Sequence, residues 1–254
     1  VLTAFLYPGL RRLNGVPEEI LSRARNAAML SAARMEESLQ AQDGILELMR
    51  SQNIPCAVLK GFSAACRYPH PELRVPGDID ILVLPSHLSA ACAEMEGVGF
   101  KKELSLEKHE CLSRANTWVE VHQMVTAFPE SEKGNYAREF MNGALSHTQD
   151  MEIQGIRFPI LDGIYQMIGL LAHKEQHLAT SGIGLRQICD WAVTVHALRE
   201  QIGEKEIATL ERCGLLHFAK VVTRLCEKYL GLPPCPWCQN AMDDQVDALM
   251  EDIL

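Results

Sequence analysis

Residues 59–83 read LKGFSAACRYPHPELRVPGDIDILV and place two aspartates at the start of an apolar run. Side chains of a strand alternate between its faces, so Asp78 and Asp80 point the same way and the aliphatic residues around them take the opposite, buried face. Their Cα atoms are expected roughly 6–7 Å apart, twice the rise per residue. Carboxylates this close repel each other unless cations neutralise them, and Mg²⁺ prefers such oxygen ligands together with substrate phosphates. The pair therefore indicates a magnesium site.

A third carboxylate, at Glu120, would complete a site for two metal ions. It lies in the alternating run WVEVH at 118–122, with valines on one face and Glu120 and His122 on the other. Paired metals about 4 Å apart clamp the attacking and leaving oxygens of phosphoryl or nucleotidyl transfer. An Asp-x-Asp pair alone is also common at solvated strand edges and turn caps, so the surrounding motifs decide between the two interpretations.

Several short motifs surround these carboxylates. They are Leu59-Lys60-Gly61, Tyr68-Pro69, Arg74, Gly77-Asp78-Ile79-Asp80-Ile81-Leu82-Val83 and Glu120-Val121-His122, followed by Gly184-Leu185-Arg186-Gln187 and Asp190-Trp191. Together they resemble the uncharacterised nucleotidyltransferase family of the polymerase-β-like superfamily. The resemblance covers roughly residues 55–195, and its central motif is more specific than its helical one.

The resemblance implies an enzyme that moves a nucleoside monophosphate from an NTP to an acceptor, a small molecule or a protein, and releases pyrophosphate. Asp78 and Asp80 match the family's D-x-D motif, which would hold two Mg²⁺ ions. Glu120 matches the third carboxylate, which would lie nearest the acceptor and act as its base. Arg186 and Asp190 lie four apart on an expected helix, which fits either a surface ion pair or a role where two domains meet.

Phosphate-binding residues are expected directly after the first strand. Lys60 and Gly61 occupy the place where the wider superfamily has a Gly-Ser pair, a departure that the resembling family shares. Ser63 is a candidate for the hydroxyl, and Lys60 for a phosphate counter-charge. Arg74 is a second candidate for phosphate contact, with a solvated loop arginine as the alternative. His122 is expected to border the metals.

Strand patterns concentrate in the middle of the chain and helical patterns at both ends. Helices are expected over 17–52, with Gly44 as a candidate interruption, and over 86–96, 135–147, 162–179, 183–200, 204–212 and 215–230. Strands are expected at 56–59 and 78–84 and in hairpins at 109–125 and 151–160, with a loop at 69–77 and a short acidic end. This order predicts an α+β fold, a small mixed nucleotidyltransferase-like sheet with packed helices and a C-terminal helical domain. We expect an N-terminal helical segment at 1–53, a catalytic core at 54–160 and the helical domain at 161–254.

Composition limits the classes of function. The 254 residues carry a formal net charge of −9, which on average repels phosphate backbones, so we expect no non-specific nucleic-acid binding. We expect no membrane attachment, because no apolar run approaches the roughly 18 residues of a membrane span. The opening VLTAFLYPGLRR lacks a basic leader before its apolar part, so we expect no signal peptide. The nine cysteines lie mostly in apolar or amphipathic contexts, which favours reduced thiols in a cytoplasmic protein.

Two other functions stay open. If the 109–125 hairpin turns through a two-residue loop, Cys111 faces Glu120 and His109 faces His122, and these four side chains could bind Zn²⁺ tetrahedrally. A non-catalytic nucleotide-binding or interaction module of the same fold is the second alternative, which the altered Gly-Ser position permits.

Two further motifs are weaker. His173 and His177 share one helix face, but a zinc protease needs a glutamate directly after the first histidine, so lining of a cleft or a structural role remains. Cys235 and Cys238 have the spacing of a redox or zinc pair. They follow a helix instead of a strand, and no second C-x-x-C motif exists, so neither chemistry is favoured.

Overall fold

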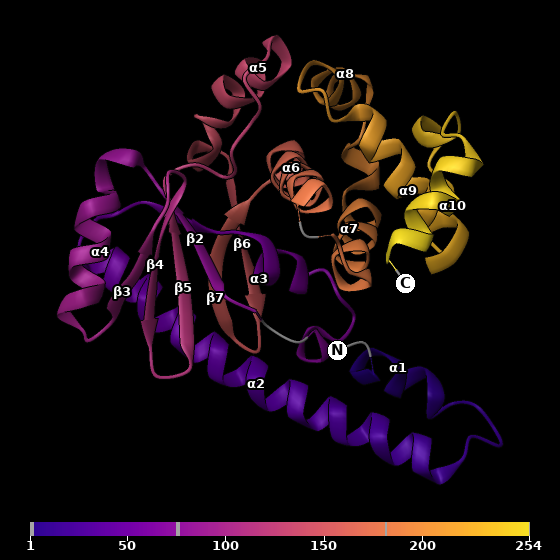
Figure 1. The fold of residues 1–254 in the computed structure, drawn as a ribbon. Helices are drawn as coiled ribbons and strands as arrows, with labels where there is room; N and C mark the ends of the chain where they lie inside the picture. Colours follow the sequence, from indigo (N-terminus) through magenta and orange to yellow (C-terminus); the bar gives the residue numbers. More distant parts are fainter. Residues whose placement is uncertain (1–2, 75–76, 181, 254) are drawn as a thin grey trace.

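A mixed seven-stranded sheet forms the centre of the molecule, and helices come before and after it in the chain (Figure 1). The computed structural model describes residues 3–74, 77–180 and 182–253. Val75 and Pro76, within the loop expected at 69–77, lie outside these residues. The predicted α+β fold is confirmed.

The strands of the sheet run in both directions. They are β1 (Cys56–Val58), β2 (Ile79–Val83), β3 (Lys101–Ser105), β4 (His109–Arg114), β5 (Thr117–His122), β6 (Thr148–Ile153) and β7 (Ile156–Leu161). Their order is β3-β4-β5-β2-β1-β7-β6. The pairs β2–β5 and β1–β7 are parallel, and the other neighbours are antiparallel.

The helices cover both faces of the sheet. They are α1 (Thr3–Leu10), α2 (Glu18–Ser51), α3 (Lys60–Ala65), α4 (Leu88–Gly97), α5 (Glu132–Met141), α6 (Gly163–Thr180), α7 (Leu185–Leu198), α8 (Glu204–Arg212), α9 (Leu216–Leu230) and α10 (Asp243–Ile253). Figure 1 shows α2 crossing the sheet and extending beyond it, with α1 beside its far end. None of the helices in the described parts of the chain is both long and apolar enough to cross a membrane.

Both hairpins turn where the sequence predicts. Gln154 and Gly155 join β6 to β7 with φ angles of 53° and 84°, and Ala115 has a φ of 52° between β4 and β5. Two-residue turns with positive φ match the twist of paired strands, and they fix which residues face each other. The register places Cys111 opposite Glu120, as expected.

Some boundaries differ from the sequence predictions. Gly44 does not interrupt α2, whose neighbouring Ile45 and Leu46 are buried and offset the low helix propensity of glycine. Strand β3 was not predicted, because apolar and polar residues do not alternate along it and every one of its residues is exposed. Only its pairing with β4 identifies it as a strand. The acidic end forms α10, which buries Val246 and Leu249. Helix α1 lies within the helical segment expected at 1–53, although the sequence pattern gives no bounds for a helix before residue 17.

Strand β2 is buried on both faces, because helices pack against the sheet on each side of it. Ile79, Ile81 and Val83 pack in an apolar cluster with residues of α2 and α4. Leu82 joins a second cluster, which contains residues of α6, α7 and α9. Because side chains alternate along a strand, Asp80 points to the same side as Leu82, toward the C-terminal helices.

The C-terminal helices are joined through a buried hydrogen bond. Trp191 of α7 and Thr223 of α9 are fully buried. The indole Nε1 donates to the Thr223 hydroxyl at 2.9 Å. A buried donor without its acceptor carries the whole cost of its desolvation.

The variant Thr223→Val should lower the free energy of unfolding by about 1–3 kcal/mol, because it leaves the Trp191 indole N–H without a partner. Urea denaturation measures this loss. The double variant with Trp191→Phe removes the donor as well, so its loss should be smaller than the sum of the two single losses. Additive losses would show that the hydrogen bond contributes nothing specific.

Candidate active site

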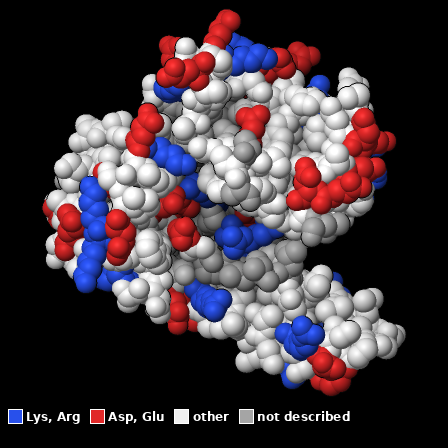
Figure 2. Space-filling model, viewed as in Figure 1, with Lys and Arg blue, Asp and Glu red and all other residues white. Residues whose placement is uncertain are grey.

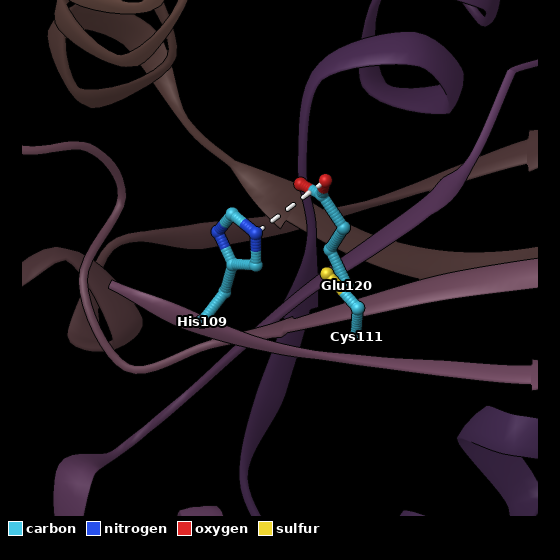
Figure 3. Close-up of side chains that lie close together, drawn as sticks. All are labelled: His109, Cys111 and Glu120. Atoms are coloured by element: carbon cyan, nitrogen blue, oxygen red, sulfur yellow. Dashed lines mark ion pairs between the residues drawn. The ribbon is translucent and has the colours of Figure 1, made fainter. Parts of the chain in front are cut away.

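Two carboxylates lie side by side on neighbouring parallel strands. The register of β2 and β5 pairs Asp80 with Glu120 and Leu82 with His122. Asp80 is buried and Glu120 is half-buried. Figure 3 shows Glu120 of β5 above Cys111 and close to His109, both of β4. Together with Asp80 of β2, side chains of three strands therefore meet on this face of the sheet.

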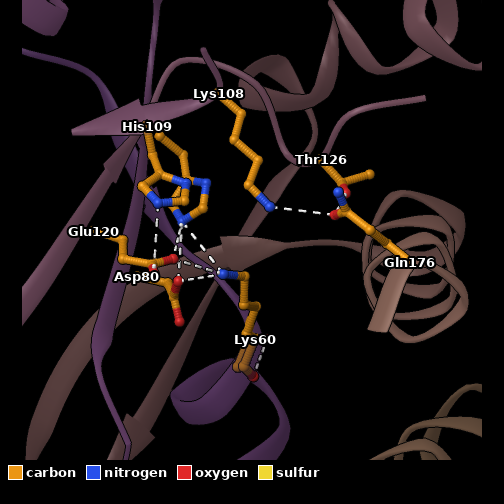
Figure 4. A network of polar contacts seen from close by, with 9 residues as sticks. Lys60, Asp80, Lys108, His109, Glu120, Thr126 and Gln176 are labelled. Atoms are coloured by element: carbon orange, nitrogen blue, oxygen red, sulfur yellow. Dashed lines mark hydrogen bonds and ion pairs between the residues drawn. The ribbon is translucent and has the colours of Figure 1, made fainter. Parts of the chain in front are cut away.

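Lys60 neutralises the two carboxylates. Its Nζ lies 2.6 Å from Asp80 Oδ1 and 3.0 Å from Glu120 Oε2 (Figure 4). Burial disfavours the ammonium, but the attraction of the two carboxylates outweighs it and raises the pKa of Lys60. Lys60 has a φ of 44°, an uncommon conformation for a residue with a side chain. Strain of this kind persists where surrounding contacts hold the residue in place, as these ion pairs do.

His122 lies on the same charged cluster. Its Nε2 is 2.9 Å from Asp80 Oδ1 and 3.0 Å from Glu120 Oε2. Burial raises the pKa of Glu120, whereas the hydrogen bond from His122 and the charge of Lys60 lower it. The lowering effects together are larger, so the net shift of the pKa is downward. Glu120 is therefore ionised at neutral pH.

Asp78 precedes β2 and lines the same cavity as Asp80 and Glu120. Partial burial, and then the negative charges of Asp80 and Glu120, raise the pKa of Asp78. The three predicted carboxylates thus face one space. Such an oxygen-only donor set fits a hard divalent cation.

The cavity has a volume of about 440 Å³ and lies between the sheet and helices α6 and α7. Figure 2 shows the hollow between the sheet and the C-terminal helices, with charged side chains of both signs around it. The carboxylates form one wall, and the other walls carry basic side chains. These are Arg74, Lys108, Lys174 and Arg186, and the imidazoles of His173 and His177 lie among them. An acidic wall opposite basic ones suits a metal-bound triphosphate, because the ligand carries both signs of charge.

Arg74 is buried, so it is not a solvated loop residue. Its Nη2 lies 2.8 Å from Asp190 Oδ2, and its Nε donates to Asp190 Oδ1 at 3.1 Å. The Tyr68 hydroxyl donates to the same Oδ1 at 2.8 Å. Asp190 is buried as well. This excludes the alternative that Arg186 and Asp190 form only a surface ion pair on α7. A Cβ on Gly61 would lie 2.9 Å from Arg74 Nη1, so a side chain at this position would push the guanidinium away from its place beside Asp190.

Ser63 is placed differently from the other expected phosphate-binding residues. It is buried, and its hydroxyl donates to the Lys60 carbonyl at 2.9 Å. Its own carbonyl accepts from Gln166 Nε2 at 2.8 Å, which ties α3 to α6. Among the described residues, Lys60, Gly61 and Arg74 line the cavity, whereas Ser63 and His122 lie behind its wall.

Helix α6 contributes a residue that sequence reasoning misses. Lys174 is only 2% exposed, and its Nζ lies 3.4 Å from the Leu170 carbonyl. Burial lowers the pKa of Lys174 to about 8, although the charge of Asp190 opposes this shift. A lysine on the apolar face of a helix, three residues after Leu171, is the signal that could have revealed it.

His173 and His177 both line the cavity, which is the first of the two roles that the sequence leaves open for them. Their rings are 4.3 Å apart in an edge-to-face arrangement. Burial, followed by the charge of Lys60, lowers the pKa of His173 to about 2. This imidazole is neutral at physiological pH and offers hydrogen bonds instead of charge.

Comparison with known proteins finds solved structures that are similar to this chain at low sequence identity. No curated protein matches the chain. One similar solved structure is ANT(2″)-Ia in complex with adenylyl-2″-tobramycin, with 12% identity and a TM-score of 0.49 over 68% of this chain and 97% of that one. Another is an antigenic nucleotidyltransferase-like protein from Paracoccidioides brasiliensis, with 13% identity and a TM-score of 0.48 over 86% and 94%.

The family assignment comes from a match along most of the sequence. The model of the uncharacterised nucleotidyltransferase family matches residues 1–231. This range contains the motifs around Asp78, Asp80 and Glu120, and the match confirms the family resemblance that these motifs carry. The chain belongs to the uncharacterised nucleotidyltransferase family.

Proposed function

We propose that this protein moves a nucleoside monophosphate from an NTP to an acceptor, with release of pyrophosphate, in a Mg²⁺-dependent reaction. Membership of the family supplies the class of reaction. The observation that carries the proposal is the cavity in which Asp78, Asp80 and Glu120 face basic side chains of the helices. The acceptor is a small molecule or a protein.

Asp78, Asp80 and Glu120 would hold two Mg²⁺ ions. The fit rests on their chemistry, because all three offer carboxylate oxygens and two of them already share the positive charge of Lys60. When bound, the ions would supply positive charge to the phosphates and to the attacking oxygen.

The chain's own residues would bind the substrate and move the proton. Glu120, ionised at neutral pH, would accept the proton of the attacking group of the acceptor. Lys60 and Arg74 would offset phosphate charge, although Arg74 shares its charge with Asp190. Lys174, whose pKa of about 8 leaves it mostly protonated at pH 7, would add a further cation, and bound phosphate would favour its ammonium more.

We further propose a role for each segment of the chain. Residues 54–160 would form the catalytic core, because they supply the sheet and its carboxylates. Residues 161–254 would shape the acceptor side, because α6 and α7 line the cavity. Residues 1–53 would support the opposite face, where α2 packs in the cluster under β2. All nine cysteines are free, which favours a cytoplasmic location.

One observation favours a second candidate function, a nucleotide-binding module without turnover. Lys60 and Gly61 stand where the wider superfamily has Gly-Ser, and Ser63 is the next hydroxyl residue along the chain. The Ser63 hydroxyl donates to the Lys60 carbonyl within α3 and does not line the cavity. Calorimetry with Mg²⁺ and each NTP, followed by assays for pyrophosphate in pooled acceptors, separates the two functions. Binding without pyrophosphate from any pool would favour the module.

Replacing Asp78 with Asn should reduce Mg²⁺-dependent pyrophosphate release by about 10²-fold or more, because a metal ligand worth several kcal/mol is lost. The assay combines NTPs with pools of metabolites and proteins as acceptors. The pKa of Asp78 is higher in the folded protein than in the unfolded chain, so its ionised form opposes folding at neutral pH. The variant should therefore unfold at no lower temperature than the wild type.

The matched control is Asp150→Asn, which alters an exposed carboxylate of β6 outside the cavity. It should keep full activity. Undiminished pyrophosphate release by the Asp78 variant would contradict the assignment of the site.

Replacing Lys60 with Met should destabilise the metal-free protein by about 3 kcal/mol, as expected when a buried ion pair loses one partner. Mn²⁺ should recover much of this loss, because it can supply the charge that Asp80 and Glu120 then lack. Thermal unfolding with and without Mn²⁺ measures the effect.

The control is Lys133→Met, which removes an exposed partner of Glu211. Its rise in unfolding temperature on addition of Mn²⁺ should equal that of the wild type. If the Lys60 variant also showed only the wild-type rise, the idea that a cation can replace the ammonium would fail.

A further inference from the structure

The two oxygens of Glu120 face different clusters of side chains. Oε2 lies 3.0 Å from Lys60 Nζ and 3.0 Å from His122 Nε2, within the cluster that includes Asp80. Oε1 lies 3.5 Å from His109 Nε2 (Figure 3). The second side of this carboxylate therefore meets an imidazole instead of another acidic group.

Cys111 completes the cluster on the Oε1 side. Strands β4 and β5 pair Cys111 with Glu120, and His109 follows two residues away on the same face. One nitrogen, one sulfur and one oxygen of these three residues lie within 4.8 Å of one another. Ligands of a tetrahedral zinc ion are roughly 3.3–3.8 Å apart at its usual bond lengths, so a small closing movement would bring them into position.

His122 does not join this cluster as a fourth ligand, in contrast to the four-residue zinc site considered from the sequence. Its ring packs beside that of His109, but its Nε2 lies 2.9 Å from Asp80 Oδ1 and 3.0 Å from Glu120 Oε2, within the cluster around Lys60. Three protein ligands remain, and all three line the cavity. Such a set leaves one position open, as in zinc sites that bind an exchangeable ligand and unlike closed structural sites.

We propose that His109, Cys111 and Glu120 form a second metal site, for Zn²⁺ or a similar transition-metal ion, with its open position toward the cavity. Imidazole and thiolate select such ions over Mg²⁺, which takes oxygen ligands. On coordination, the Cys111 thiol loses its proton to solvent. The site is distinct from the carboxylate set because it adds nitrogen and sulfur donors from β4.

The shared carboxylate gives this site a regulatory consequence, which rests on the proposed function. A transition-metal ion on Glu120 Oε1 would withdraw negative charge from the Oε2 side, where Asp80 and Lys60 lie. The carboxylate would then be a poorer ligand for Mg²⁺ and a poorer base for the acceptor. Zn²⁺ would therefore inhibit nucleotidyl transfer.

Co²⁺ tests the site without nucleotide or Mg²⁺. Titration of the metal-free, reduced full chain should give a near-ultraviolet band from thiolate bound to Co²⁺, which saturates at about one equivalent and disappears on addition of Zn²⁺. Cys111→Ser should abolish the band. Cys56→Ser, on β1, and the double variant Cys235→Ser/Cys238→Ser should retain it.

The wild-type titration decides the proposal even if a variant fails to fold. Absence of the near-ultraviolet band in the wild type, or its persistence in Cys111→Ser, would overturn the site. Neither result concerns pyrophosphate release, so failure here is distinguishable from failure of the proposed function. In a turnover assay, Zn²⁺ should inhibit the wild type more strongly than Cys111→Ser, and equal inhibition would overturn the regulatory consequence.

Discussion

Asp80 and Glu120 carry like charges on adjacent parallel strands, and the ammonium of Lys60 between them is the interaction on which the site depends. Burying two carboxylates together is costly without a cation, because both ionised forms are disfavoured. The alternation along β2 fixes which side they face. A slip of one residue would move Asp80 into the apolar cluster with α2 and α4, so the packing of that cluster protects the register.

A second buried ion pair holds the helices against this sheet. Arg74 precedes β2 and Asp190 lies on α7, so their contact joins the approach to the carboxylates with a wall of the cavity. The Tyr68 hydroxyl satisfies a further lone pair of Asp190. Buried pairs of this kind fix geometry more than they add stability. The acidic and basic walls thus belong to two charge clusters. The cluster on the sheet keeps a net negative charge, because Lys60 offsets only one of its carboxylates, whereas Arg74 and Asp190 balance each other at the helix junction.

Local patterns predicted the parts of the site that local structure determines. The alternation around Asp80 and Glu120 predicted the buried strands, and a two-residue turn predicted that Cys111 faces Glu120. The partner of Arg74 could not be found this way, because Asp190 is 116 residues distant in sequence. Lys174 lies on the apolar face of its helix, which is a signal in the sequence, but only tertiary packing shows that its ammonium is buried beside the cavity. Strand β3 likewise depends on its partner, since its own side chains are all exposed.

The most direct measurement is a crystal structure of the protein with Mg²⁺ and a non-hydrolysable NTP. The account predicts metal ions on Asp78, Asp80 and Glu120, with the triphosphate in the cavity beside α6 and α7. It also predicts that Lys60 Nζ leaves at least one of its two carboxylate partners. A nucleotide bound elsewhere, such as in the larger cavity of about 980 Å³ lined by residues of α7, α8 and α9, with no ion on the three carboxylates, would contradict it.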